Sequence, residues 1–400
     1  MSSQIPQILR PIAPVLLSLT LIEFGVAALN PLIGYQLTLR EVPTQIIGII
    51  ASCYFAGFVT GSLTAARAVD RVGHIRAITT FAIIMAGGVL LLALTSSSVL
   101  WAAIRFCMGY GMAGMFICVE SWLSHKSTLE TRGRIFSAYL TVAQAGGIVG
   151  PLALALFDPS GTTLFLVVAL FYASSIIPMA LTEVGNPEIG DRVRFGIVRL
   201  FQISPLGVIV AGASAFASTA FNQLVPVYIN DNGLTPGHLA SLLMIAKIGA
   251  VSSQVPVGYL SDRLGRRPMI VACAALAATG AAGAFMWGGQ SFFVLAGSVA
   301  LMVGASSPLY GLAVAHTNDH CQRSEYVAAA GGSMLAWSIG ATIGPTVAAG
   351  VMNGIGATGL FVYSASAYGA IALYALYRSL RRAAPQRAPH DPTMMPGKSP

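Results

Sequence analysis

Long apolar runs follow one another from residue 14 to residue 377, and they constrain the fold more than any other feature of this 400-residue sequence. Each run is long enough to cross the roughly 30 Å hydrocarbon layer of a membrane as a helix. Only 22 basic and 14 acidic residues are present, too few to cover a water-soluble protein of this size. The sequence therefore predicts an all-α integral membrane protein and excludes a soluble globular fold.

Charged residues, prolines and glycines divide the apolar runs into two sets of six expected spans. The first six cover residues 14–38, 45–68, 77–95, 99–123, 135–157 and 162–182. The second six cover residues 204–229, 239–260, 268–287, 292–316, 327–352 and 360–377. We expect an N-terminal six-helix bundle over 1–183, a cytoplasmic linker over 184–200, a C-terminal six-helix bundle over 201–378 and a disordered basic cytoplasmic tail over 379–400.

The positions of lysine and arginine predict how the chain is oriented. If the N-terminus is cytoplasmic, every Lys and Arg except Arg40, Arg105 and Lys247 lies on the cytoplasmic side, as the positive-inside rule requires. We therefore expect a multi-pass protein of the inner (plasma) membrane with both termini in the cytoplasm. Orientation also explains the net charge of +8, so we expect no nucleic-acid partner and place the basic tail near anionic lipid head groups.

Motifs for metal sites, nucleotide hydrolysis and covalent catalysis are missing from the sequence. The five cysteines form no CxxC pair, so neither a zinc site nor a disulfide framework is indicated, and we expect no metal and no cofactor. No GxxxxGK[ST], HExxH or GxSxG string occurs. We therefore expect that the chain is not an enzyme, that it is a monomer, and that it interacts with membrane lipid, a small-molecule substrate and protons.

Two pairs of strings recur with nearly the same offset. GSLTAARAVDRVGHIRA and GYLSDRLGRRP end the second and eighth spans and place Asp70 and Asp262 192 positions apart. GGIVGP and GATIGP lie in the fifth and eleventh spans and place Pro151 and Pro345 194 positions apart. The shared offset predicts an internal duplication of a six-helix unit, with the two copies flanking a central cavity.

The string GYLSDRLGRR at residues 258–267 resembles the loop signature of the major facilitator superfamily (MFS). The first-half copy is degraded, because Ala66 and His74 replace a glycine and an arginine of that signature. RFCMGYGMAG at residues 105–114 resembles the family's fourth-helix motif. VESWLSHKSTLETRGR at 119–134 and SPLYGLAVAHTND at 307–319 resemble the YcaD-like branch. That narrower likeness implies a shared cytoplasmic-side arrangement of Glu120, Trp122, His316, Asn318 and Asp319.

The resemblance implies a fold of twelve helices that rocks between two states, with charged contacts on one face that form and break. We expect Asp262 to meet a helix N-terminus and Arg266 to reach Asp319. Glycines are expected to permit tight turns and close helix approach. The alternative is that these are ordinary loop charges that only orient the chain. The predicted cytoplasmic gate comprises Asp70, Arg71, His74, Glu120, Gly258, Asp262, Arg263, Gly265, Arg266, His316 and Asp319.

Three ionisable residues lie inside the expected spans, where an unpaired charge costs at least about 2.5 kcal/mol. Glu23 could carry a proton, form a fixed salt bridge with Arg105, or bind a substrate ammonium group. Arg105 could contact an anionic solute or anchor helix carbonyls, and Lys247 could contact the solute or pack sideways. The candidate residues for proton coupling or substrate binding are Glu23, Arg105, Lys247, Tyr110, Asn222 and Gln223, with Asn30 and Gln254 as further hydrogen-bonding candidates.

Taken with the resemblance, these residues predict a secondary active transporter that moves a small organic solute by alternating access. Proton coupling is expected from the intramembrane acid, and export is favoured over uptake by likeness to other twelve-helix members. Two alternatives stay open. One is proton-coupled or facilitated uptake of a small metabolite. The other is a non-transporting membrane sensor with the same fold, which the degraded first-half loop favours.

Overall fold

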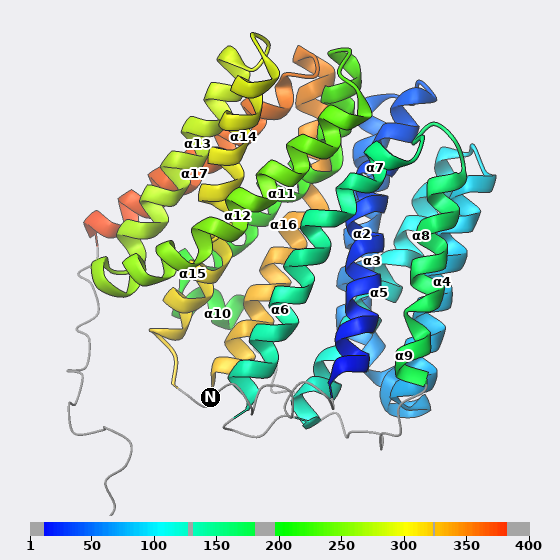
Figure 1. The fold of residues 1–400 in the computed structure, drawn as a ribbon. Coiled ribbons are helices and arrows are strands. Elements are labelled where there is room, and N and C mark those ends of the chain that lie inside the picture. Colours follow the sequence, from blue (N-terminus) through cyan, green and yellow to red (C-terminus); the bar gives the residue numbers. More distant parts are fainter. Residues whose placement is uncertain (1–11, 127–130, 181–196, 323–324, 382–400) are drawn as a thin grey trace, which may run out of the picture.

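The protein is all-helical in the residues that the computed structural model describes, which are 12–126, 131–180, 197–322 and 325–381 (Figure 1). Residues 382–400 of the expected tail and residues 184–196 of the expected linker lie outside these ranges. The helices stand side by side in one bundle, which agrees with the fold class that the apolar runs predict.

The two halves contain similar sets of helices. The first half consists of α2 (Ala13–Leu39), α3 (Thr44–Val72), α4 (His74–Leu94), α5 (Ser98–Lys126), α6 (Arg132–Val149), η1 (Gly150–Leu152), α7 (Ala153–Leu156), α8 (Thr163–Ser174) and α9 (Ile176–Ala180). The second half consists of α10 (Ile197–Ile203), α11 (Pro205–Asp231), α12 (Pro236–Leu264), α13 (Arg266–Trp287), α14 (Phe292–Ser306), α15 (Leu309–Asn318), α16 (Tyr326–Ile355) and α17 (Gly359–Arg381).

Together these helices form twelve membrane crossings. Eleven segments of the described chain are long and apolar enough to span a membrane as continuous or nearly continuous helices. The fifth crossing is broken, because α6 ends at Val149, a 3-10 turn contains Pro151, and α7 ends at Leu156. Proline cannot donate a backbone hydrogen bond, so it interrupts a helix at this point. The twelve expected spans therefore match the structure, with one of them shorter and bent.

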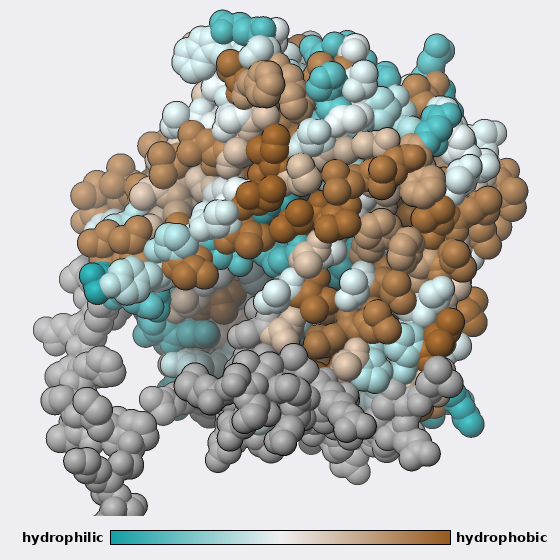
Figure 2. Space-filling view, in the orientation of Figure 1, coloured by the Kyte–Doolittle hydropathy of each residue, from teal (hydrophilic) through white to brown (hydrophobic). Residues whose placement is uncertain are grey.

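The outer face of the bundle is apolar. Leu94 and Phe293 are 83% and 86% exposed, and many other large apolar side chains are exposed to a smaller extent. Figure 2 shows such side chains across the middle of the visible face, with polar side chains at its upper end. A soluble protein does not tolerate so large an apolar surface, whereas lipid tails solvate it. The chain is a multi-pass membrane protein.

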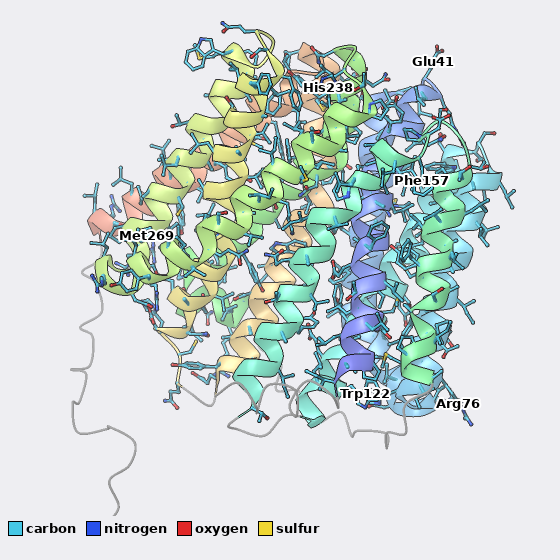
Figure 3. All side chains as sticks on the ribbon, viewed as in Figure 1. Glu41, Arg76, Trp122, Phe157, His238 and Met269 are labelled. Atoms are coloured by element: carbon cyan, nitrogen blue, oxygen red, sulfur yellow. The ribbon has the colours of Figure 1, made fainter. Side chains whose placement is uncertain are left out.

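The two ends of the bundle differ in charge. Arg76 lies at one end and Glu41 and His238 at the other (Figure 3). We call the end that carries Arg76 and the turns at Gly73 and Gly265 the basic end, and the end that carries Glu41 the opposite end.

The turns at Gly73 and Gly265 are built alike. Gly73 has φ 85° and Gly265 has φ 99°, and residues other than glycine rarely adopt such positive φ values. The Gly73 amide donates to Val69 O at 2.8 Å, and the Gly265 amide donates to Ser261 O at 3.0 Å. In each case the next helix starts at the following residue, so the repeated glycine gives both halves the same abrupt reversal.

A second glycine pair repeats at the same 192-residue offset. Gly57 of α3 packs so closely on α5 that a Cβ built on it would collide with the carbonyl oxygen of Phe106. A Cβ built on Gly249 of α12 would lie 2.9 Å from the carbonyl oxygen of Ala300 in α14. Small residues let membrane helices approach to backbone contact. The duplication therefore extends from the loops into the packing of each half.

The two halves join toward the opposite end. A Cβ built on Gly34 of α2 would lie 2.8 Å from Gln223 O in α11, and one built on Gly48 of α3 would lie 2.6 Å from Pro345 O in α16. The Ser52 and Thr346 hydroxyls hydrogen-bond at 2.7 Å. We call these contacts between the halves the seam. Backbone contacts and paired hydroxyls hold it together, and no ion pair within 4.0 Å joins the halves in the described residues.

Candidate functional site

Glu23 and Lys247 contact two adjacent glycines of α6, where helices of the two halves meet. Glu23 is in α2 of the first half, and a Cβ built on Gly146 of α6 would lie 2.8 Å from its Cβ. Lys247 is in α12 of the second half, and a Cβ built on Gly147 would lie 2.6 Å from its Cε and 3.2 Å from its Nζ. The glycine pair therefore leaves room for an acid and a base that come from different halves.

The two charges act on each other through space. They do not touch, because the ion pairs within 4.0 Å found in the described part of the chain do not include Glu23 or Lys247. Both side chains are partly buried. An acid and a base that face each other without direct contact can each exchange a proton or take up an opposite charge from a solute.

Arg105 is held by other partners. It is 1% exposed, and its Nη2 donates to Asn30 Oδ1 at 3.0 Å. Its guanidinium carbon lies 4.1 Å from the centre of the Tyr54 ring, which is a cation–π distance. The structure thus differs from the alternative in which Glu23 forms a fixed salt bridge with Arg105. Asn30 follows Glu23 by two helical turns and takes the place of the acid.

Two tyrosines complete this region, and the sequence patterns did not select either of them. Tyr54 lies under the Arg105 guanidinium, as described above. The ring of Tyr172 in α8 packs against Gly25, where a built Cβ would lie 3.0 Å from its Cε1. Among the described residues, neither the Tyr172 hydroxyl nor Arg105 Nε has a hydrogen-bond partner. Buried polar groups without partners are uncommon, so the Tyr172 hydroxyl and Arg105 Nε are candidates for contact with a polar solute.

The remaining polar candidates lie elsewhere. The Tyr110 ring packs on Phe81 with centroids 6.2 Å apart, within the first half. Asn222 is exposed and donates to Ser218 O of its own helix at 2.9 Å. Gln223 is buried at the seam through its backbone. The structure therefore brings Glu23 and Lys247 to α6, places Arg105 of α5 against Asn30 and Tyr54, and packs Tyr110 on Phe81.

Three of the predicted gate residues of the second half, Asp262, Arg266 and Asp319, form one ion-pair network. Arg266 Nη1 lies 2.5 Å from Asp262 Oδ1, and Arg266 Nε lies 3.7 Å from Asp319 Oδ2. Arg266 also donates to the Ser261 hydroxyl. Asp262, which was expected to meet a helix N-terminus, instead pairs with Arg266. The neighbouring Arg263 points away, with its guanidinium 4.2 Å from the Tyr259 ring centre.

The predicted gate residues of the first half are arranged differently. His74 is buried and its Nε2 lies 3.1 Å from the Ser121 hydroxyl, so it ties α4 to α5. Glu120 hydrogen-bonds Tyr139, and its charge also acts on Tyr310 of α15. Glu120 is therefore bonded within the first half, to Tyr139 of α6, and lies within electrostatic range of Tyr310 in the second half.

Four other predicted gate residues lie apart from these contacts: two are exposed, one is a glycine without close neighbours, and one is buried. Asp70 and Arg71 are exposed at the end of α3. Gly258, which was expected to allow close helix approach, has no atom within 4 Å of a Cβ built on it, so it faces open space. His316 is buried against His320, with ring centres 4.6 Å apart.

Sequence comparison agrees with the helical architecture and the repeated loops. The model of the Major Facilitator Superfamily matches residues 15–246 and 207–396. The chain belongs to this superfamily. The two overlapping matches leave only the ends of the chain uncovered, and membership points to a membrane transporter and not to an enzyme.

This MFS chain is similar to transporters that are themselves described as uncharacterised. It is 25% identical to the YcaD protein of Escherichia fergusonii over 371 residues, which cover 89% of this chain and 93% of the relative. It is 26% identical to an MFS-type transporter of Enterobacter sp. (strain 638) over 388 residues, which cover 95% of this chain and 98% of the relative. These relatives confirm the likeness to the YcaD-like branch.

Solved structures share the fold of this MFS chain at low sequence identity. A bacterial homologue of the human lysosomal transporter Spinster, in an inward-facing and occupied conformation, superposes with a TM-score of 0.77 at 14% identity, covering 93% of this chain and 96% of that one. The nucleoside transporter NupG superposes with a TM-score of 0.74 at 12% identity, covering 92% and 98%. Identities this low establish a common fold only.

Proposed function

We propose that this protein is a monomeric secondary active transporter of the inner membrane that moves a small organic solute by proton-coupled alternating access, with export favoured over uptake. The observation that carries the proposal is that Glu23 and Lys247, from different halves, lie against the adjacent residues Gly146 and Gly147 of α6 without forming an ion pair. The acid belongs to the first half and the base to the second. Rocking that moves α2 relative to α12 changes the separation of these two charges.

The separation of Glu23 and Lys247 affects whether Glu23 holds a proton, and this couples the movement of the halves to proton transfer. A nearby positive charge favours an ionised carboxylate, whereas a carboxylate in an apolar surrounding favours the protonated form. When the halves bring Lys247 close, Glu23 releases its proton, and when Lys247 moves away Glu23 takes one up. A solute that carries charge competes for the same two groups, which links its binding to the proton.

The charge distribution supports a cytoplasmic location for the basic end. The seam then lies on the periplasmic side, and its contacts close that side of the bundle. The ion pairs of Arg266 lie at the cytoplasmic end within the second half. This arrangement corresponds to an inward-facing state, in which Glu23 exchanges protons with the cytoplasm.

Transport assays in proteoliposomes test the proposal. The purified protein is reconstituted with a pH-sensitive dye inside the vesicles, a pH gradient is imposed, and a broad panel of metabolites and amphiphilic drugs is screened for gradient-driven flux. We expect at least one solute to move together with protons. If no solute and no protons move across the panel, the protein is better described as a sensor that retains the fold.

The seam predicts how the closed side responds to mutation. Thr346→Val removes a hydroxyl that bonds Ser52 at 2.7 Å, a loss worth about 1 kcal/mol or roughly fivefold in the population of the outward-open state. Cys53 follows Ser52 in α3 and reports that opening. In a background in which the other four cysteines are replaced by alanine, a membrane-impermeant thiol reagent added from the periplasmic side is expected to label Cys53 about fivefold faster.

Thr342→Val is the matched control for this experiment. Thr342 lies one turn earlier in α16 and donates only to Ser338 O of its own helix, at 2.8 Å. Labelling of Cys53 in this variant is expected to stay at the parent rate. Equal labelling of the Thr346 and Thr342 variants would show that the hydroxyl pair does not hold the periplasmic side closed.

A further inference from the structure

Glu23 and Lys247 approach α6 from different directions. Successive residues of a helix point about 100° apart around its axis, so Gly146 and Gly147 face different neighbours. Glu23 lies against the first of these glycines and Lys247 against the second, and no ion pair within 4.0 Å joins the two side chains. Each charge nevertheless acts on the other. The two charges are therefore close enough to attract each other and too far apart to neutralise each other directly.

Neither charged group has a direct partner. Among the residues that the structure describes, the Glu23 carboxylate and the Lys247 ammonium group take part in no ion pair and no hydrogen bond. Both side chains keep part of their surface exposed. A charge without a partner inside a membrane span is costly. An opposite charge that a solute brings to either group would therefore stabilise it.

Tyr172 of α8 gives a second and independent indication of a ligand. Its side chain is fully buried, with the ring against Gly25, and it lies within electrostatic range of Glu23. The hydroxyl has no hydrogen-bond partner in the described part of the chain. A buried hydroxyl normally has a partner, so this one is available to a polar group that arrives from outside the chain.

The presence of both charges determines which solute fits. A solute that carries only an ammonium group is attracted by Glu23 and repelled by Lys247. A solute that carries only a carboxylate is attracted by Lys247 and repelled by Glu23. A zwitterion meets an opposite charge at each end and adds no net charge to the interior of the membrane.

We propose that the solute is a small zwitterion whose ammonium group binds Glu23 and whose carboxylate binds Lys247. Hydrogen bonds between charged partners of this kind are about twice as strong as those between neutral ones. The inference rests on the proposed transport function and names its substrate class. The ammonium group and a proton compete for the same carboxylate, so one leaves when the other binds. This competition agrees with the exchange of an exported solute for protons.

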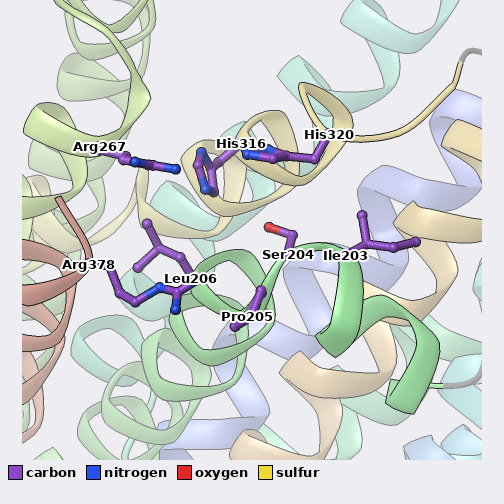
Figure 4. Close-up of a pocket in the computed structure, with 8 residues that line it drawn as sticks. All are labelled: Ile203, Ser204, Pro205, Leu206, Arg267, His316, His320 and Arg378. Carbon is purple, nitrogen blue, oxygen red and sulfur yellow. The ribbon is translucent and has the colours of Figure 1, made fainter. Parts of the chain in front are cut away.

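The pocket at the basic end offers no alternative site for such a solute. Arg267, His316, His320 and Arg378 are among the residues that line it (Figure 4). Its volume is about 10 Å³, which is room for one water molecule. A solute with two charged groups does not fit there, which leaves the acid and the base on α6 as its binding groups.

Binding to the full-length protein in a maltoside detergent tests the inference without a proton gradient. L-leucine and its isomer ε-aminocaproate are zwitterions with different charge spacings, leucinamide is the matched cation, and isocaproate is the matched anion. A ligand that binds the folded state raises the midpoint of thermal unfolding with its concentration. We expect at least one zwitterion to act at concentrations about tenfold below those of the cation and the anion, because each of these lacks one charge-assisted hydrogen bond.

Lys247→Met is expected to bind the zwitterion about tenfold more weakly and to lose the preference for it over leucinamide, because the carboxylate has lost its partner. Arg76→Met is the matched control. It removes one positive charge from an exposed residue of the basic end and is expected to bind as the parent protein does.

Glu23→Gln tests the other end of the solute if Lys247→Met does not yield folded protein. This variant is expected to lose the preference for the zwitterion over isocaproate. The amide oxygen of glutamine still accepts a hydrogen bond from the ammonium group, so the zwitterion continues to bind at high concentration.

The inference is overturned if leucinamide or isocaproate binds as tightly as the zwitterions, if neither zwitterion binds, or if Lys247→Met and Arg76→Met bind equally. These results are separable from the test of transport. A zwitterion that binds in detergent but shows no proton-driven flux supports the site and contradicts the proposed coupling. Proton-driven flux of singly charged solutes alone contradicts the site and supports the coupling.

Discussion

Glu23→Gln is expected to abolish proton-driven solute flux in proteoliposomes while leaving the yield of folded protein unchanged. Glutamine keeps the size and the hydrogen-bonding capacity of the side chain but cannot take up or release a proton. Glu23 makes no ion pair within 4.0 Å in the described residues, so its neutralisation breaks no direct contact. Solute counterflow, which requires no net proton movement, is expected to continue.

Glu41→Gln provides the matched control, because it makes the same chemical change at an exposed residue of the opposite end. Its proton-driven flux is expected to equal that of the parent protein. A second comparison separates coupling from structure. If Glu23 only balances the charge of Lys247, the double variant Glu23→Gln with Lys247→Met should recover proton-driven flux. Recovery in the double variant, or full flux in Glu23→Gln alone, would remove Glu23 from the coupling mechanism.

Gly109→Ala is expected to destabilise the first half by about 3 kcal/mol, which lowers the folded-to-unfolded ratio more than a hundredfold. A Cβ at Gly109 would collide with the carbonyl oxygen of Tyr54 and would lie 2.9 Å from the amide nitrogen of Phe58. Both contacts are with backbone, which cannot turn aside as a side chain can. The Tyr54 ring under Arg105 would shift as well, so we also expect loss of transport in the protein that still folds.

Gly87→Ala makes the same substitution where space is available. Gly87 lies within α4, and no atom lies within 4 Å of a Cβ built on it. Alanine favours helix over glycine by about 1 kcal/mol, so this variant is expected to be as stable as the parent or slightly more stable. The measurement is the midpoint of thermal unfolding of both variants in detergent. Equal midpoints for Gly87→Ala and Gly109→Ala would contradict the close packing of α3 on α5.

The sequence predicted the features that depend on the order of residues along the chain, which are the membrane spans and the turns between them. Apolar length fixed the number of crossings, because the thickness of a bilayer sets the length of a helix that spans it. Aspartate, arginine and glycine in a fixed order located the turns at Gly73 and Gly265, because glycine supplies the positive φ at which one helix stops and the next starts. The predicted approach of Arg266 to Asp319 also follows from sequence, since both residues lie at helix ends on the same face of the bundle.

The arrangement around Glu23 could not be predicted because it depends on how each helix is rotated about its axis. A helix that is apolar on every side gives no indication of which face it turns toward its neighbours. Lys247 could therefore have packed sideways, and only the structure places it over Gly147. The same limit applies to Tyr54 and Tyr172, which no motif distinguishes from the other tyrosines. The sequence identified Asn30 as a polar candidate, but only the structure shows that it accepts a hydrogen bond from Arg105.

The uncharged contacts of the seam mean that the basic end and the opposite end of the bundle respond differently to the salt concentration. Mobile ions screen exposed charges over about 8 Å at physiological ionic strength, so added salt weakens the network of Arg266 with Asp262 and Asp319. The glycine contacts and paired hydroxyls of the seam carry no net charge and are left unaffected. Dissolved electrolyte thus loosens the packing of α12, α13 and α15 within the second half and leaves the contacts between the halves unchanged.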